Sequence, residues 1–144
     1  MSDIYSTDLL QLAADIPHAE RLAAPDASAS KVSRICGSEL TLDLMFDAAG
    51  RIADLGLEVN ACALGQASAS VFARNAIGAD RAEVEAGRDA LKAMLQDGGP
   101  APQGRFAGLK ILAPAASYRQ RHGSILLAFD AACTAMAEPA GAGS

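Results

Sequence analysis

Two stretches of the chain alternate hydrophobic and polar residues with a period of two, as a strand does when one of its faces is buried. They cover residues 38–47 and 51–59, and the D-A-A-G sequence at 47–50 between them has the composition of a turn. We therefore predict a β-hairpin. An isolated hairpin is marginally stable, so we expect a third strand from residues 32–35. The hydrophobic face of the hairpin consists of Leu40, Leu42, Leu44, Phe46, Leu55, Leu57 and Val59.

Other stretches place hydrophobic residues three and four positions apart, which predicts helices. Asp80 and Glu83 have the spacing of a capping box at a helix start, and Gly78 is expected to cap the end of the preceding helix. Pro17 and Pro114 are expected to close two shorter helical segments. The predicted helices cover residues 4–12, 66–78, 80–97, 106–112 and 122–137.

Length and charge narrow the class of protein. The chain has 144 residues, which suits one domain over residues 1–138 with a disordered tail at 139–144. The formal net charge of −5 argues against nucleic-acid binding, which depends on cations that neutralise phosphates. No basic segment followed by an apolar run opens the sequence, and no apolar stretch approaches the roughly 20 residues that span a bilayer. We expect a cytoplasmic protein without membrane contact.

Three cysteines are the residues best suited to chemistry. Their odd number, without a secretion signal, indicates reduced thiols rather than disulfides. Cys62 lies just before a predicted helix, where the helix dipole favours a thiolate, and Cys36 is followed by the flexible Gly37. Their separation alone is weak evidence for a metal site, because a lone cysteine is more often a small buried hydrophobe. Cys133 lies on the apolar stripe of the last predicted helix and is interpreted as structural.

Three sequence segments resemble motifs of the IscU/SufU/NifU iron–sulfur scaffold family. A-C-A-L-G-Q-A-S-A-S, which contains Cys62, is similar to the family's G-C-x-x-x-x-A-S-A-S segment, and I-C-G-S, which contains Cys36, is similar to its C-G-D motif. R-H-G-S-I-L-L-A-F-D-A-A resembles the third motif, in which a cysteine follows His or Lys. The resemblance covers about residues 5–137. The long stretch between the second and third motifs makes the chain closer in length to the SufU branch than to the IscU branch.

This resemblance implies an α+β fold, with a small three-stranded antiparallel sheet packed against about five helices, in agreement with the elements predicted above. It also implies a surface site where three cysteines and an aspartate hold a [2Fe–2S] cluster, iron or zinc. Cys36 and Cys62 match two of these ligands, whereas Ser38 replaces the aspartate and Gly123 replaces the third cysteine. His122 precedes the missing cysteine and is the candidate third ligand, with an open fourth position.

Two other polar features have a simpler interpretation. His18 lies in a predicted loop and is expected to be a solvated loop residue. Arg119 and Arg121 could dock an acidic partner, although solvated surface charges are the preferred explanation. Residues 116–120 lack the L-P-P-V-K sequence by which the specialised chaperone recognises the IscU branch, so we do not predict that partner.

The leading hypothesis is a scaffold of iron–sulfur cluster assembly, a carrier rather than a turnover enzyme, that works with a cysteine desulfurase and other assembly proteins. A second hypothesis is a zinc-dependent sulfurtransferase of SufU type that accepts a persulfide. A third is an adaptor or regulator that keeps the fold without a stable metal. Since one chain offers only two matching cysteines, a homodimer that shares a cluster is a further expectation.

Overall fold

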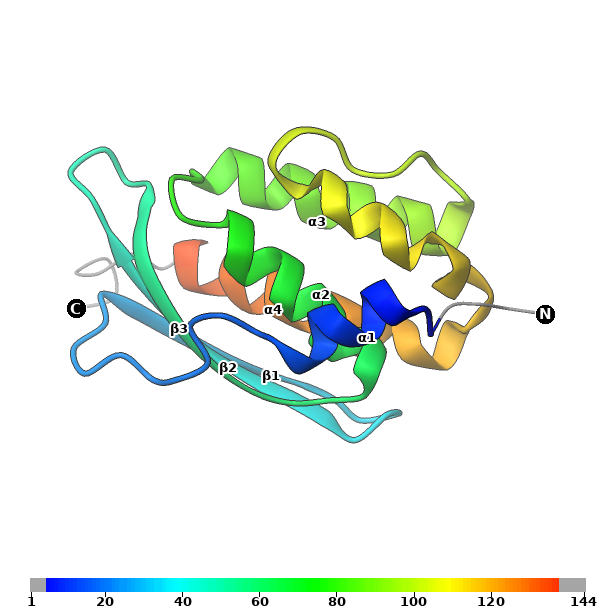
Figure 1. Ribbon diagram of the computed structural model, residues 1–144. Helices are drawn as coiled ribbons and strands as arrows, with labels where there is room; N and C mark the ends of the chain where they lie inside the picture. The colour runs from blue at the N-terminus through cyan, green and yellow to red at the C-terminus, as the bar shows by residue number, and fades with distance from the viewer. Residues whose placement is uncertain (1–4, 138–144) are drawn as a thin grey trace.

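The computed structural model describes residues 5–137 and shows helices packed on one face of a sheet (Figure 1). The predicted tail at 139–144 lies outside the described residues. The elements, in chain order, are α1 (Thr7–Ala14), β1 (Ala27–Ser33), β2 (Ser38–Phe46), β3 (Ile52–Asn60), α2 (Ala63–Asn75), α3 (Arg81–Asp97), the 3₁₀ segments η1 (Gly104–Ser117) and η2 (Arg119–Arg121), and α4 (His122–Ala137).

The sheet confirms the predicted hairpin. Its three strands are antiparallel in the order β1-β2-β3, and Leu42 of β2 pairs with Leu57 of β3. Both leucines are fully buried, as the alternating pattern predicts for the face that meets the helices. In the turn, the Asp47 side chain accepts hydrogen bonds from the backbone N–H groups of Ala49 and Arg51, both at 2.9 Å. The α+β architecture inferred from the sequence is therefore correct.

The third strand lies earlier in the chain than predicted. β1 ends at Ser33, so residues 32–33 of the strand predicted over 32–35 belong to it, whereas residues 34–37 form a turn. This turn depends on Gly37, which has a φ of 70° and donates its N–H to the Ser33 carbonyl at 2.8 Å. The third strand is confirmed, but its predicted bounds were wrong because β1 reads A-S-A-S-K-V-S, where small side chains hide the alternation of half-buried and exposed positions.

α4 lies at the centre of the helical layer, between the sheet on one side and α2 and α3 on the other (Figure 1). Phe72 of α2, Phe106 of η1 and Phe129 of α4 meet in the core, with ring centroids 5.1 to 6.0 Å apart. Gly87 lets α3 approach this cluster, because a Cβ atom there would lie 2.8 Å from the Phe106 ring. Aromatic edge-to-face packing thus joins α2, η1 and α4.

Helix boundaries differ from the predicted ones mainly at α2 and η1. α2 starts at Ala63, with Cys62 as its N-cap, and ends at Asn75, three residues before the predicted cap. Gly78 instead donates its N–H to the Ile52 carbonyl at 2.8 Å and extends the edge of β3. η1 does not end before Pro114, as predicted, but continues to Ser117. Its 3₁₀ turns extend the row of buried apolar residues to Ala115. The capping box at the start of α3 is confirmed.

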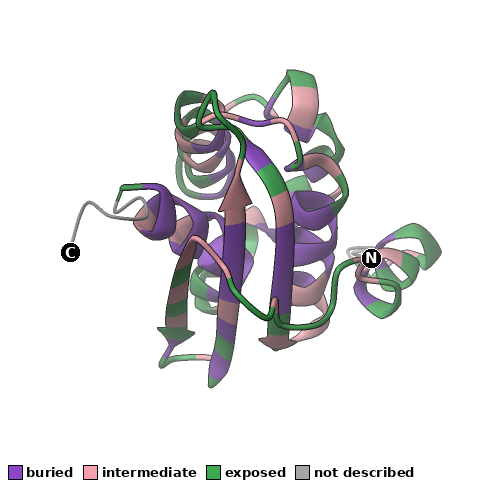
Figure 2. Ribbon diagram, turned by 90° about the vertical axis from the view of Figure 1, so that its left-hand side faces the viewer, coloured by how far each residue is buried: buried purple, intermediate pink, exposed green. Residues whose placement is uncertain are grey.

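The outer face of the sheet is partly covered by the chain between α1 and β1 (Figure 2). Asp43 points to this face and is nevertheless fully buried. Its carboxylate accepts hydrogen bonds from Arg21 at 2.6 and 3.0 Å, from the Leu22 N–H at 3.0 Å and from the Ser28 hydroxyl at 2.5 Å. Directly beneath the crossing chain, a Cβ atom at Gly56 would lie 2.1 Å from the Glu20 carbonyl. One carboxylate therefore fastens this segment to the sheet.

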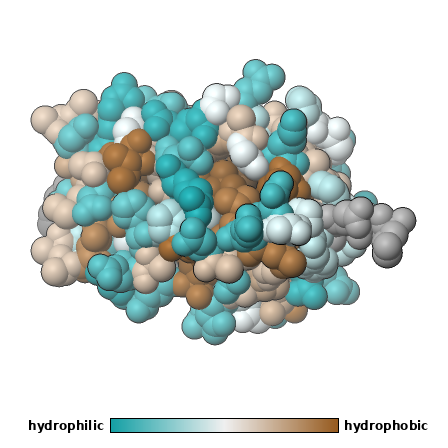
Figure 3. Space-filling view, in the orientation of Figure 1, coloured by the Kyte–Doolittle hydropathy of each residue, from teal (hydrophilic) through white to brown (hydrophobic). Residues whose placement is uncertain are grey.

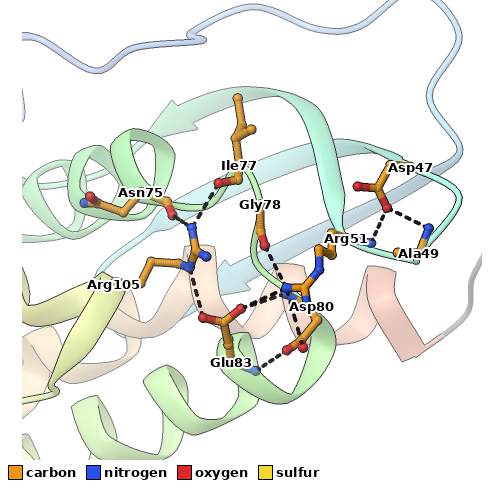
Figure 4. A network of polar contacts seen from close by, with 9 residues as sticks. All are labelled: Asp47, Ala49, Arg51, Asn75, Ile77, Gly78, Asp80, Glu83 and Arg105. Atoms are coloured by element: carbon orange, nitrogen blue, oxygen red, sulfur yellow. Dashed lines mark hydrogen bonds and ion pairs between the residues drawn. The ribbon is translucent and has the colours of Figure 1, made fainter.

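A polar network fixes the end of the molecule near the β2–β3 turn (Figure 4). Arg105 of η1 donates to the carbonyls of Asn75 and Ile77, both at 3.0 Å, and to Glu83 at 3.2 Å. Arg51 of the hairpin also lies 3.6 Å from the Glu83 carboxylate. These contacts join η1, α3 and the end of α2 to the sheet at the end of α2 opposite Cys62.

The surface mixes hydrophilic and hydrophobic residues, and Figure 3 shows hydrophobic residues gathered near the middle of the face that α1, α2 and η1 form. Within residues 5–137, no helix has both the length and the apolar character needed to cross a bilayer.

Candidate functional site

Three chain segments meet at one end of the sheet: the β1–β2 turn, the start of α2 and the start of α4 (Figure 1). Cys36 belongs to the first and Cys62 to the second. Glu39 pairs with Asn60 at the last position of the β2–β3 ladder, so both cysteines lie just beyond the same end of the sheet. The two sequence-predicted cysteines are therefore placed at a common end of the fold.

Cys36 is partly exposed in the tight turn after β1. Its thiol donates a hydrogen bond to the backbone carbonyl of Gln120, which ties the turn to the segment that leads into α4. Val32 and Ile35 beside it are 63% and 79% exposed, which is unusual for large hydrophobic side chains. Cys36 is thus an accessible thiol on an apolar corner of the molecule.

Cys62 is the N-cap of α2 and is also partly exposed. Burial acts to raise the pKa of the Cys62 thiol. Hydrogen bonds from the Ser124 hydroxyl and from the backbone N–H groups of Gly65 and Leu64 act in the opposite direction, as does the nearby charge of Arg121. Together they lower the pKa below its ordinary value. The donors at a helix N-terminus and the cation all favour the negative sulfur. Cys62 is therefore suited to bind a metal or to attack as a thiolate.

Two buried serines, Ser124 and Ser38, lie on the inner side of Cys62. The Oγ atom of Ser124 lies 3.5 Å from the Cys62 sulfur and 2.9 Å from Oγ of Ser38. Ser124 and Ser38 are only 1% and 2% exposed, so this chain of polar groups is shielded from water. A Cβ atom at Gly65 would lie 2.3 Å from Oγ of Ser124, which shows how closely α2 and α4 approach here. Ser38 therefore helps to hold the Ser124 hydroxyl in place beside the Cys62 sulfur.

Gly123 lies at the exposed start of α4, against the end of β1. It is exposed and has no side chain, and a Cβ atom there would lie 2.8 Å from Oγ of Ser33. The hydroxyl of Ser33 occupies the space in front of this position at the end of β1. The position that the resemblance assigns to a third cysteine is therefore at the surface and supplies no ligand.

His122 is almost fully buried at the start of α4, with 8% exposure. Its Nε2 atom lies 3.0 Å from the Ala115 carbonyl and 3.1 Å from the Ala116 carbonyl. Carbonyl oxygens only accept hydrogen bonds, so Nε2 carries the proton and Nδ1 holds the lone pair in the neutral ring. Among residues 5–137, no three His, Cys, Asp or Glu side chains are grouped to hold a metal. The role of His122 as third ligand therefore stays a prediction.

The remaining candidates lie away from this end or inside the core. Cys133 is 6% exposed within α4, and burial raises the pKa of its thiol, as expected for a structural cysteine. His18 contributes its backbone carbonyl, which accepts the Leu57 N–H at 3.0 Å over the edge strand β3. The sequence analysis missed Ser124. Its signal was a polar residue inside an otherwise apolar helical run, directly after Gly123.

Comparisons with known proteins agree with this fold. The family model for the NifU-like N terminal domain matches residues 5–124. A crystal structure of a nitrogen-fixing NifU-like protein (N-terminal) from Brucella abortus is 46% identical, with a TM-score of 0.91 and coverage of 94% of each chain. An iron–sulfur cluster assembly scaffold protein for the SUF system from Fervidobacterium islandicum AW-1 is 22% identical, with a TM-score of 0.84; 93% of this chain and 97% of that chain are covered, and this likeness concerns the fold alone. The comparison with curated proteins found no match.

Proposed function

This chain belongs to the family of NifU-like N-terminal domains, and on that premise we propose that it is a scaffold of iron–sulfur cluster assembly. The observation that supports the proposal most is the placement of Cys36 and Cys62 beyond the same end of the sheet, both partly exposed. Thiolate sulfur is the common protein ligand of iron–sulfur clusters. Cys36 and Cys62 would hold iron or a [2Fe–2S] cluster as cargo for transfer to other proteins.

His122 is the proposed third, adjustable ligand, through Nδ1. Histidines that bind metals commonly donate their other ring N–H to a backbone carbonyl, and here Nε2 makes that contact with Ala115 and Ala116. For Nδ1 to complete a site, the start of α4 would have to shift toward the cysteines, because no group of three ligands is present among the described residues.

The proposed partners are a cysteine desulfurase, which would supply sulfur, and the proteins that receive the cluster. The reducing conditions of the cytoplasm would keep the three cysteines as thiols. In this role the chain carries cargo and catalyses no turnover of its own.

Anaerobic reconstitution tests this proposal. The purified protein is incubated with ferrous iron and sulfide under a thiol reductant, desalted, and analysed for iron, sulfide and visible absorption. We expect a [2Fe–2S] absorption spectrum that is lost in Cys36→Ala and in Cys62→Ala. Cys133→Ala is the matched control, because this buried thiol lies in the core and should leave the spectrum unchanged. An unchanged spectrum in Cys36→Ala would count against the proposed ligands.

A second function, that of a sulfur acceptor with or without zinc, is favoured by the surroundings of Cys62. Backbone N–H groups at the start of α2 and the Ser124 hydroxyl stabilise a thiolate at this partly exposed sulfur. The thiolate would attack the outer sulfur of a desulfurase cysteine persulfide. A new S–S bond then forms on Cys62, the old S–S bond breaks, and the desulfurase cysteine leaves as a thiolate, without net oxidation.

Mass spectrometry after incubation with a cysteine desulfurase and free cysteine tests the second function. The expected result is one added sulfur on the wild-type protein that is absent in Cys62→Ala and kept in Cys133→Ala. Zinc content is measured on the same samples. A protein that takes up no cluster, zinc or sulfur would instead be an adaptor of cluster assembly that keeps the fold alone.

A further inference from the structure

A hollow of about 520 Å³ is lined by residues 117–121, where η1 ends and η2 leads into α4. Volumes of this size are typical of sites for small molecules. We propose that the hollow binds a small thiol that carries carboxylates, such as glutathione or free cysteine, and that the thiol sulfur takes the open fourth ligand position of the cluster. This site rests on the scaffold function proposed above and adds to it a ligand from outside the chain.

The hollow is positively charged. Arg119 and Arg121 line it, and no ion pair found within residues 5–137 involves either guanidinium group. The chain as a whole has a formal net charge of −5, so two cations in one hollow differ from the general character of the molecule. Guanidinium groups bind carboxylates through pairs of charge-assisted hydrogen bonds. A ligand with carboxylates therefore suits this hollow better than a neutral ligand.

Both candidate cysteine ligands are close to this hollow. The Cys36 thiol donates a hydrogen bond to the carbonyl of Gln120, one of the residues that line it. The guanidinium group of Arg121 is near enough to the Cys62 sulfur for its charge to favour the thiolate. A small thiol whose carboxylates are bound by the two arginines would therefore present its sulfur to a metal held by Cys36 and Cys62.

The external sulfur would supply a ligand that the chain lacks. Cys36, Cys62 and His122 are three proposed ligands, whereas a [2Fe–2S] cluster takes four. The position that the family resemblance assigns to a further cysteine is Gly123, which is exposed and lies only two residues after Arg121. The sulfur of a bound thiol would therefore coordinate where that cysteine side chain is missing. The thiol proton passes to solvent in this step, a metal–sulfur bond forms, and nothing is oxidised or reduced.

Titration of the metal-free protein tests the binding site by itself. S-Methylglutathione keeps both carboxylates of glutathione but has no thiol, and NMR of isotope-labelled protein follows its binding. We expect saturable shifts at residues 117–121, with affinity about threefold weaker in each of Arg119→Gln and Arg121→Gln. Arg34→Gln removes the same charge beside Cys36, outside the lining of the hollow, and should bind as the wild type does. Shifts that do not saturate, or that inorganic phosphate reproduces in full, would overturn the proposal.

Reconstitution tests the role of the thiol in the cluster. The protein is reduced, desalted without oxygen, and supplied with iron, sulfide and either glutathione, free cysteine or neutral mercaptoethanol. We expect a half-maximal cluster yield at a lower concentration of glutathione or cysteine than of mercaptoethanol, and native mass spectrometry should show the thiol bound with the cluster. Arg119→Gln/Arg121→Gln should remove this preference. Gly123→Cys should form the cluster without added thiol, whereas Gly123→Ala should still need it.

The possible results separate the thiol site from the scaffold function. A wild-type cluster that forms equally well without any added thiol, on one chain or between two, would overturn the proposed site and leave the scaffold function intact. Failure to form a cluster under every condition, with Gly123→Cys included, would refute the scaffold function and the role of the thiol together. A preference for either carboxylated thiol supports the site, and the lower half-maximal concentration shows which of the two binds better.

Discussion

The Cys62 sulfur lies 3.5 Å from the hydroxyl oxygen of Ser124, and this contact links the start of α2 to the start of α4. It places a polar donor against the sulfur from the side opposite solvent, because Ser124 is 1% exposed. The same hydroxyl is 2.9 Å from Ser38, so one serine joins the α2 start to β2 as well.

Replacement of Ser124 by Ala should make Cys62 less reactive. The substitution removes one of the donors that lower the pKa of Cys62, so its pKa rises and less thiolate is present at pH 7. A hydrogen bond to a charged group is worth roughly 1.5 kcal/mol, which corresponds to a loss of thiolate of up to about tenfold. The rate of iodoacetamide alkylation at Cys62, followed by peptide mass spectrometry across pH 6 to 10, measures this. Ser117→Ala, at an exposed serine near the site, is the control, and an equal loss of rate there would contradict the explanation.

Addition of a third cysteine at Gly123 should strengthen the binding of a cluster by one chain. The new Cβ atom would lie 2.8 Å from Oγ and 3.4 Å from Cβ of Ser33. The Ser33 hydroxyl can rotate away, so Gly123→Cys should alter the free energy of unfolding by about 1 kcal/mol or less. With three thiolates in one chain, we expect the reconstituted variant to retain more iron and sulfide after desalting than the wild type. Gly123→Ala supplies the Cβ without the sulfur and should retain no more iron and sulfide than the wild type.

Asp43 should make stability depend on pH in the acid range. Burial acts to raise its pKa, but hydrogen bonds from Arg21, Ser28 and Leu22 outweigh burial and lower the pKa below the usual value. Its stabilising effect is therefore complete above the unfolded pKa of about 3.9 and is lost as pH falls through the lower folded pKa. Urea unfolding at a series of pH values measures this.

Asp43→Ala tests the same contact at constant pH. The substitution leaves the Leu22 N–H and the Ser28 hydroxyl without their acceptor and should cost about 2 to 4 kcal/mol at pH 7. It should also flatten the acid dependence of stability. Asp54→Ala, at a half-buried aspartate of β3 that caps only its neighbouring N–H, is the control. A variant with full acid sensitivity would show that other carboxylates dominate.

Gly87→Ala should destabilise the aromatic cluster. The new methyl group would lie 2.8 Å from the Phe106 ring and 3.3 Å from the Phe129 ring, and crowding of this kind costs roughly 1 to 3 kcal/mol, partly offset by helix propensity. Thermal unfolding measures the change. Gly108→Ala, whose nearest neighbour is a Val71 methyl at 3.5 Å, should be nearly neutral. Phe106→Leu should recover part of the lost stability in the double variant.

Periodicity predicted most of the fold because the hairpin and the long helices bury hydrophobic faces in regular steps. Leu42 and Leu57 are fully buried, as their pattern indicates. β1 was misplaced because alanine and serine differ too little in size and polarity to mark a buried face. The interior position of Asp43 could not be predicted locally, because it depends on a segment that crosses the sheet from far along the chain.

The candidate site was predicted from motifs rather than from periodicity. Cys36 and Cys62 were chosen as candidate ligands by resemblance, and the register of β2 with β3 explains why they share one end of the sheet. Ser124 was overlooked because hydrogen bonding to Cys62 spans 62 residues of chain, which no local spacing reveals. The orientation of His122 likewise depends on the carbonyls of η1, whose 3₁₀ conformation is not visible in the sequence.

The close packing of α2 against α4 has an evolutionary consequence. Any side chain at position 65 would have to displace the Ser124 hydroxyl and would disturb Cys62 without touching it. A substitution at Gly65 is therefore subject to natural selection through its effect on the chemistry of Cys62. In descendants of this chain, we expect positions 65 and 124 to change together or not at all.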